Sequence, residues 1–478
     1  MATKWEFGEF LVLLCLTMCY ATGGGLVYCL GLMQGTWIAK LNLTTSEASV
    51  INSVTFAVTL LPAPAVQFLR DYYNVQPYIV FLSAATFVSI GLYLTSIATT
   101  FLTILISNGV VFSIGIVFSV TGTLTTVYHY FLDDKITLVS SCVSAGMGMG
   151  MVMVSMSFKY MEPVIGWRGF VQFELIFVIS YVMAFLVFFP PISRVLGVRT
   201  RKMKELELKQ LNAVETEGLL AENNNLENEQ KIVVVEKKQK EDGSLSISND
   251  SLPSLNNHGH DMDSISQSVK DKVKKAKDNL LFNPLFLLLL FSWVFNEATY
   301  NAVMVHQPER VVKMGYSLIN GADTLAINGA VQIVARFSVG LIADRQLISV
   351  IRLSQLSKLT LGVMAIVSTF FPFLMFQTFF MFLVGACGGI VSTTDVILIK
   401  DCVKHGRELG ISILLLMDGL SSFISIALAG VLYSVFESYN AVFIILGGSS
   451  LAAFVLVLIL DVLMRTKYRE REHTYSRM

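Results

Sequence analysis

Residues 329–343 of the sequence read Gly-Ala-Val-Gln-Ile-Val-Ala-Arg-Phe-Ser-Val-Gly-Leu-Ile-Ala, a largely apolar stretch with a single charge, Arg336. Apart from that charge, the stretch is typical of the middle of a membrane-spanning helix. Insertion scales place an arginine at the helix centre roughly 2.5–3.5 kcal/mol uphill, so the side chain must face a partner or a water-filled cavity rather than lipid. The stretch predicts a membrane protein in which Arg336 has a functional role.

The composition of the whole chain supports this prediction. Of the 478 residues, 54% are hydrophobic and 15% are charged, and the mean hydropathy is +0.63. That apolar share exceeds the usual value for soluble domains. The 35 basic and 35 acidic residues cancel, so overall charge does not favour binding to nucleic acid. The six cysteines lack paired spacing, so neither a disulfide framework nor a zinc site is expected.

Dividing the chain at charged, proline and glycine positions gives runs long enough to span a bilayer, which takes about 20 mostly apolar residues. The expected spans are 8–34, 47–68, 77–98, 101–128, 136–158, 170–190, 284–305, 321–343, 349–370, 373–399, 408–434 and 440–464. The first run is longer than a signal-peptide core, so we interpret it as a retained helix. We predict an all-α membrane protein with twelve transmembrane helices in two six-helix halves.

The charged residues divide the chain into three parts. Residues 1–193 form the first half, 194–283 a cytoplasmic and largely disordered loop, and 284–478 the second half with a short tail. The loop is rich in Lys, Glu, Asn and Ser, and it has too little apolar surface to offset the entropy of ordering. If both termini are cytoplasmic, most basic loop residues lie on the cytoplasmic side, as the positive-inside rule requires. We therefore expect this orientation, in the plasma membrane. Asn42-Leu-Thr44 then faces outward and is a candidate for glycosylation.

Charged residues inside the expected spans concentrate in the second half: Glu297, Arg336, Asp395 and Asp418. The planar guanidinium of arginine binds a carboxylate bidentately. Two interpretations follow: Arg336 binds a carboxylate substrate, or it forms a permanent ion pair with Asp395 or Asp418. The three carboxylates are candidates for gating or proton transfer, and the alternative for each is a satisfied interhelical hydrogen bond.

In the first half, Glu174 is expected near an interface and hydrated. Gln34, Asn52 and Asn108 are polar candidates, either as ligands or as helix-packing hydrogen bonds, and we include Gln34 among the substrate-binding candidates. Ser144-Ala-Gly-Met-Gly-Met-Gly150 predicts a helix-packing surface, with cavity lining as the alternative. Phosphate-binding loops, HExxH motifs and nucleophile elbows are absent from the sequence, so we expect no enzyme, no cofactor and no metal site.

Several segments resemble the monocarboxylate transporter family of the major facilitator superfamily. Gly166-Trp-Arg-Gly-Phe170 is similar to that family's GWRG element, and Ala335 to Asp344 resembles its R-x-x-x-G-x-x-A-D ending of span eight. Ala429-Gly-Val-Leu-Tyr433 and Ser438-Tyr-Asn-Ala-Val-Phe443 resemble its pattern in the last two spans. The resemblance covers most of the chain outside the central loop.

The resemblance implies an alternating-access transporter in which two pseudo-symmetric halves move around a central site. Arg336 matches the substrate-carboxylate arginine. Proton-linked members carry an aspartate one turn earlier, where this chain has Gln332, and a lysine in span one, which is absent from Gly31-Leu-Met-Gln-Gly-Thr36. Proton coupling is therefore doubtful. Some members also use a single-span glycoprotein partner for delivery to the cell surface.

We expect a secondary transporter that moves a small monocarboxylate or related organic acid across the lipid bilayer, with Arg336 as the carboxylate anchor and Gln332 as its neutral neighbour. Asp418 is the expected coupling or gating residue. The alternative is a transporter-like receptor or scaffold that signals through the cytoplasmic loop. Deletion of residues 205–265 separates the two, because a transporter should tolerate it.

Overall fold

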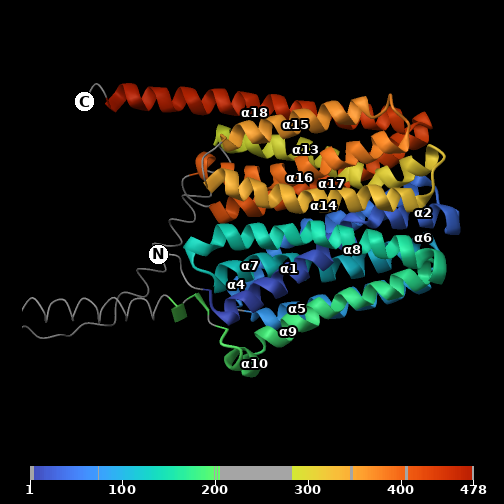
Figure 1. Ribbon diagram of the computed structural model, residues 1–478, viewed down its shortest axis with the longest axis horizontal. Helices are drawn as coiled ribbons and strands as arrows, with labels where there is room; N and C mark the ends of the chain where they lie inside the picture. The colour runs from blue at the N-terminus through green and yellow to red at the C-terminus, as the bar shows by residue number, and fades with distance from the viewer. Residues whose placement is uncertain are drawn as a thin grey trace, which may run out of the picture. The chain divides into compact units, whose positions relative to one another are not determined.

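The computed structural model describes residues 5–73, 75–198, 200–201, 203–204, 283–344, 348–403 and 407–475. The described residues are helical and contain no β-strand. Both sets of long helices belong to one compact unit. Figure 1 shows them running along a common long axis. Most of the loop predicted over 194–283, with the segment 205–265, lies outside the described residues.

The first half is built from helices that are repeatedly broken within a span. They are α1 (Phe7–Tyr28), α2 (Leu30–Leu41), α3 (Thr45–Leu60), α4 (Ala63–Tyr72), α5 (Pro77–Ile97), α6 (Phe101–Ile104), the π-helix η1 (Leu105–Phe112), α7 (Ser113–Tyr130), α8 (Asp133–Phe173), the 3-10 helix η2 (Glu174–Val178), α9 (Ile179–Phe188) and α10 (Pro190–Val195). The second half has longer, unbroken helices. They are α13 (Pro284–Lys313), α14 (Leu318–Asp344), α15 (Val350–Val367), α16 (Leu374–Cys402), α17 (Arg407–Phe436) and α18 (Tyr439–Tyr475).

The number of spans follows from three observations. Nine helical segments in the described part of the chain are long and apolar enough to cross a membrane. One of them, Leu138–Phe188, contains two spans, because Gly166 has φ 70° and ψ 168° and breaks the helix there. The helices α13 and α14 are not among the nine, but they are 30 and 27 residues long and carry Glu297 and Arg336. Counting these gives the twelve spans predicted from the sequence, and the predicted fold class is confirmed.

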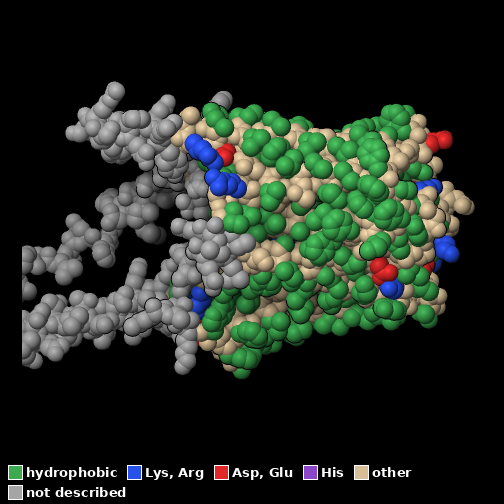
Figure 2. All heavy atoms as spheres, turned by 45° about the horizontal axis from the view of Figure 1, so that its top comes forward, with side chains coloured by type: hydrophobic (Ala, Val, Ile, Leu, Met, Phe, Trp, Pro, Cys, Tyr) green, Lys and Arg blue, Asp and Glu red, His purple; other side chains and the backbone are tan. Residues whose placement is uncertain are grey.

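The bundle has two ends that matter for the site. The helix α1 begins at one of them, called the near end here, and α2 finishes at the other, the far end. Successive spans alternate in direction, so α13 runs from near to far and α14 returns. Hydrophobic side chains cover the middle of the visible face in Figure 2, while the coloured charges lie toward the two ends. This apolar band is the surface that a bilayer would cover.

Local capping explains how the far-end turn between α2 and α3 forms. Asn42 adopts φ 54° and ends α2, because a short polar side chain tolerates the left-handed region. Thr44 then caps α3: its hydroxyl accepts from the Glu47 amide at 3.2 Å, while the Glu47 carboxylate accepts from the Thr44 amide at 2.8 Å. Asn42 is exposed. Its glycosylation stays a prediction.

The two halves meet closely where α8 crosses α14. A Cβ atom on Gly148 would lie 2.5 Å from the Gly329 carbonyl oxygen, and one on Gly329 would lie 2.7 Å from the Gly148 carbonyl oxygen. Small residues therefore allow the two backbones to touch, as at other close helix crossings in membranes. The segment 144–150 thus contributes a packing surface between halves, in agreement with the first interpretation of its sequence.

Candidate functional site

Arg336 is buried, and its side-chain contacts in the described part of the chain are to a sulfur and an amide. Its side chain is 5% exposed and lies about 12 Å from the near end of α14. One guanidinium nitrogen, Nη2, donates to Met147 Sδ at 3.3 Å and to Gln332 Oε1 at 3.1 Å, and Nε has no hydrogen-bond partner. Among the described residues, no carboxylate lies within ion-pair distance of the guanidinium. The structure therefore holds an uncompensated cation inside the bundle.

The interpretation of Arg336 as half of a permanent ion pair is wrong, because both predicted partners are engaged elsewhere. Asp395 accepts from Lys358 Nζ at 2.6 Å and from Ser354 Oγ at 2.7 Å, and both side chains of this pair are fully buried. Asp418 accepts from Asn301 Nδ2 at 3.0 Å and from Ser422 Oγ at 3.3 Å. Lys358, a charge within the apolar run 349–370, was not among the candidates named from the sequence.

Gln332 connects Arg336 to the neighbouring helix. Its Nε2 donates to the Tyr300 hydroxyl of α13 and to Asn328 Oδ1 at 3.1 Å, while its Oε1 accepts from Arg336 one turn later. Tyr300 also packs against Tyr28 of the first half, with ring centroids 6.0 Å apart. We call Arg336, Gln332, Tyr300 and Met147 the arginine site.

Two further carboxyls lie deep in the bundle near this site. Glu297 and Asp418 are each 7% exposed. Asp418 accepts from Asn301, which lies one turn after Glu297 and directly after Tyr300 in α13. Glu297 Oε1 accepts from Asn296 Nδ2 at 3.3 Å. Neither carboxyl has a described cation within ion-pair distance. The structure thus brings two of the three predicted coupling residues together and pairs the third, Asp395, with Lys358.

Gln34 belongs to a different cluster from Arg336. Its Nε2 donates to Glu309 Oε2 at 2.9 Å and lies 3.3 Å from His306 Nδ1, and its Oε1 accepts from Asn52 Nδ2 at 2.7 Å. Thr45 Oγ1 donates to the second Glu309 oxygen, Oε1, at 2.9 Å. We call Gln34, Asn52, Thr45, His306 and Glu309 the far-end network. It links α2 and α3 to α13, and Gln34 makes interhelical hydrogen bonds within it. Substrate binding by Gln34 stays a prediction.

His306 of this network is fully buried, and its Nε2 lies 3.2 Å from the carbonyl oxygen of Ile426. Two more links join the halves at the far end. Lys159 forms an ion pair with Asp323 at 2.7 Å, and the hydroxyls of Ser46 and Ser434 are 2.7 Å apart. The far end of the bundle is therefore closed by contacts between the halves.

Glu174 also lies in unexpected surroundings. It is 6% exposed, and it lines a small internal cavity of the first half with Cys29, Thr95 and Asn108. The expectation of a hydrated interfacial carboxylate is wrong, because η2 turns this side chain into the helix bundle. In the described residues, no three His, Cys, Asp or Glu side chains are placed to hold a metal ion.

Comparison with known proteins places this geometry in context. The sequence profile described as Major Facilitator Superfamily matches residues 13–399. Among solved structures, a crystal structure of the nucleoside transporter NupG, determined as a point mutant, superposes with a TM-score of 0.63. The alignment has 10% identity and covers 94% of this chain and 99% of the other. At that identity the likeness shows the fold alone. The search of curated proteins gave no match.

Proposed function

The chain belongs to the major facilitator superfamily and is an integral membrane protein, and from this premise we propose that it carries a small organic acid across the membrane by alternating access. One observation carries the proposal: Arg336 is a buried cation with a free Nε and no carboxylate within ion-pair distance among the described residues. Superfamily membership supports transport, and the arginine supports an anionic substrate.

The chemistry of the arginine site favours a carboxylate. A buried, uncompensated charge is costly, so a substrate anion that binds Arg336 gains both the Coulomb attraction and the relief of that cost. A carboxylate fits the planar fork of the guanidinium with two parallel hydrogen bonds. Gln332 holds the fork from one side. The ring of Tyr300, whose hydroxyl accepts from Gln332, offers apolar surface to the organic part of the substrate.

The carboxyls divide into two roles in this proposal. Asp418 and Glu297 lie near the arginine site without cationic partners, so they are the gating or coupling residues. Asp395 is already compensated by Lys358, so it holds α15 against α16. Gln332 cannot titrate where proton-linked monocarboxylate transporters have an aspartate. We therefore expect that position 332 does not couple transport to protons. If uptake depends on pH, Asp418 is the residue whose protonation should cause it.

Uptake of a radiolabelled panel of lactate, pyruvate, aromatic amino acids and longer organic acids, in expressing cells at about pH 6 and pH 7.5, tests the proposal. Arg336→Gln should lower uptake at least about tenfold at equal surface expression, which corresponds to about 1.4 kcal/mol. The matched control is Arg465→Gln, because Arg465 is an exposed arginine paired with Asp461 of its own helix. Normal uptake by Arg336→Gln overturns the assignment.

The receptor or scaffold alternative is tested in the same assay. Deletion of residues 205–265 should leave uptake unchanged in a transporter, whereas a signalling protein would show no uptake with or without the deletion. Location in the plasma membrane, cytoplasmic termini and a glycoprotein partner for delivery are further proposals. Surface labelling of tags at the two termini checks the first two, and co-purification checks the third.

A further inference from the structure

Glu174 lies in a small, mostly apolar pocket of the first half that the proposed transport site does not use. It begins η2, about 10 Å from the far end of its span. The cavity beside it has a volume of about 10 Å³ and is lined by Glu174, Cys29, Thr95, Asn108 and apolar side chains. That volume is close to the space that one water molecule requires.

The surroundings of Glu174 contain no counter-charge. Among the described residues, no lysine, arginine or histidine is within ion-pair distance of its carboxyl. The lining residues come from α1 and α2, α5, η1 and α8, and Cys29 is the other titratable group among them. The polar neighbours are already engaged: Asn108 Oδ1 accepts from Thr55 at 3.2 Å, and Thr95 donates to Ser107 at 3.0 Å.

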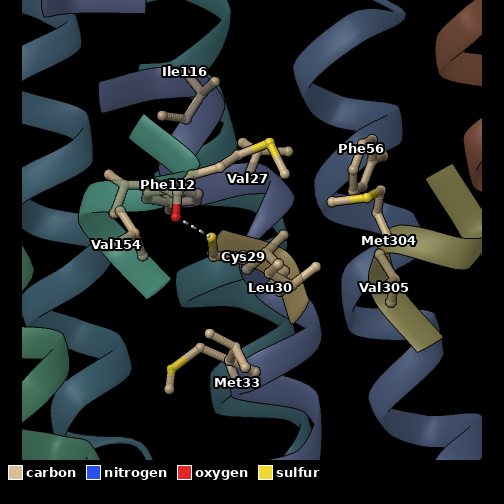
Figure 3. Close-up of a cluster of buried hydrophobic side chains, with 14 of the residues drawn as sticks. Val27, Cys29, Leu30, Met33, Phe56, Phe112, Ile116, Val154, Met304 and Val305 are labelled. Carbon is tan, nitrogen blue, oxygen red and sulfur yellow. Dashed lines mark hydrogen bonds between the residues drawn. The ribbon is translucent and has the colours of Figure 1, made fainter. Parts of the chain in front are cut away.

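The cavity adjoins the break between α1 and α2. Cys29 leaves the helical conformation there, with φ −91° and ψ 5°, and its Sγ donates to the Met151 carbonyl at 3.6 Å. Figure 3 shows Cys29 between Phe112 and Val154 on one side and Leu30 on the other, with Met33 farther along α2. Beyond the break, α2 carries Gln34 of the far-end network, and Gly31 packs against the Val305 carbonyl of the second half.

We propose that Glu174 is a proton-binding site that couples to the far-end gate. With α2 docked, as here, the carboxyl is shut in an apolar pocket with no cation, and the form compatible with that pocket is the neutral acid. When α2 moves away from the second half, the break at Cys29 lets water reach the cavity, and the hydrated carboxyl releases its proton. The acid proton then goes to that water.

The ligand is a proton rather than a metal cation. A sodium or calcium ion takes several oxygen ligands in its first shell, and calcium alone takes six to eight. The cavity has room for about one water molecule, and Glu174 supplies the one carboxyl among its lining residues, so a multi-oxygen cation shell does not fit there. One carboxyl and one water are sufficient for proton exchange.

The proposal gives a definite sign. The closed state binds the proton more tightly than the open state, so the closed far end is favoured at low pH and is lost as pH rises. One proton changes the closed-to-open ratio by at most about tenfold per pH unit. The inference rests on the proposed alternating access, but not on Arg336 or on the identity of the substrate.

Distance measurements between spin labels test it without a substrate. The labels replace two exposed far-end residues of opposite halves, through Lys40→Cys and Asn440→Cys. The background carries Cys142→Ser and Cys29→Ser, because Cys142 is not fully buried and Cys29 lines the cavity that the proposed opening hydrates. The full-length protein in lipid nanodiscs is titrated between about pH 5 and pH 8. The population with longer distances should grow with pH.

Glu174→Gln should hold the short distance at every pH, because the amide mimics the protonated acid. The matched control, Glu162→Gln, removes a half-exposed acid of α8 and should leave the response unchanged. If Glu174→Gln does not fold, Glu174→Asp replaces it and should keep the response with a displaced midpoint. A native-like response in Glu174→Gln, an undisplaced midpoint in Glu174→Asp, or wild-type distances that ignore pH would overturn the proposal. Loss of uptake in Arg336→Gln is independent of all three outcomes.

Discussion

The far-end network and the arginine site both place a charged side chain inside the bundle, but they treat it in opposite ways. Glu309 is 2% exposed, and each of its carboxylate oxygens accepts a hydrogen bond from the opposite half. Arg336 is similarly buried, yet its Nε has no hydrogen-bond partner, and its Nη2 donates to the Met147 sulfur and the Gln332 amide oxygen, both neutral acceptors. A buried charge with hydrogen-bond partners on another helix holds the two helices together, whereas a buried charge without such partners can bind a ligand. This difference in hydrogen bonding distinguishes the far-end network, which closes the bundle, from the arginine site more clearly than the depth of either in the membrane does.

The buried ion pair of the second half extends this contrast and should show the largest effect on stability. Lys358→Met leaves Asp395 buried without its cation, which should cost about 3–5 kcal/mol of unfolding free energy. Arg336→Met removes a charge that has no partner, so it should leave stability unchanged or raise it. Thermal unfolding of the purified variants in detergent compares the two.

The double variant Lys358→Met with Asp395→Leu is the control, because it removes both charges and should recover most of the loss. Equal losses of unfolding free energy in Lys358→Met and Arg336→Met would contradict the claim that Lys358 is compensated by a partner and Arg336 is not.

The glycine contact between α8 and α14 should be the next most sensitive position. Gly148→Leu places atoms where the Gly329 carbonyl now lies, and overpacking of this kind typically costs about 1–3 kcal/mol. It should also lower the uptake rate, because the two halves can no longer approach there. Gly448→Ala is the matched control, since nothing lies within 4 Å of a Cβ at Gly448. A wild-type rate in Gly148→Leu would mean that this crossing opens during transport.

Removing one member of the far-end network should destabilise the closed far end without affecting the arginine site. Gln34→Ala leaves a Glu309 oxygen and the Asn52 amide without their partners, at a cost of about 1–3 kcal/mol to the closed state. The spin-label distances should lengthen at fixed pH, while the affinity of the open form for substrate stays the same. Gln355→Ala, which removes a hydrogen bond to Asp461 at 3.3 Å within the second half, serves as control. Shorter distances in Gln34→Ala would contradict the role of the network.

The smallest effect is expected at the surface. Arg465 is 62% exposed and pairs with Asp461 one turn earlier in α18. Exposed pairs at this spacing contribute about 0.3–0.5 kcal/mol. Arg465→Ala should therefore change the unfolding temperature and the uptake only within measurement error, and a large loss would show that α18 has a partner at this position.

The sequence was sufficient for the spans and for Arg336, but not for the partners. Spans are predictable because length and apolarity are properties of one segment. Arg336 is predictable as a candidate because a charge inside such a segment is costly unless it has a partner or a ligand. Pairing depends on the rotation of each helix and on which neighbour it faces, so the sequence left Asp395 and Asp418 as alternative partners of Arg336 and did not indicate the pair of Asp395 with Lys358. Gln34 was grouped with Arg336 although the structure places it against Glu309.

Glu174 illustrates a different limit. A span over 170–190, as hydropathy predicts it, puts the carboxyl near an interface. The break at Gly166 instead starts the descending helix earlier, and η2 then directs Glu174 inward. A backbone break of this kind depends on a single residue adopting φ 70°, which hydropathy does not register.

The polarity of α13 and α14 has a consequence for how the protein is made. These are the first two helices of the second half to leave the ribosome, and neither is among the nine described segments that qualify as apolar spans. Segments with central charges partition poorly from the translocon into lipid. Asn301 of α13 bonds to Asp418 and Ser422, which belong to α17 and are synthesised more than a hundred residues later. We therefore expect α13 to be retained at the translocon until α17 arrives, so that the second half enters the bilayer as a group rather than helix by helix.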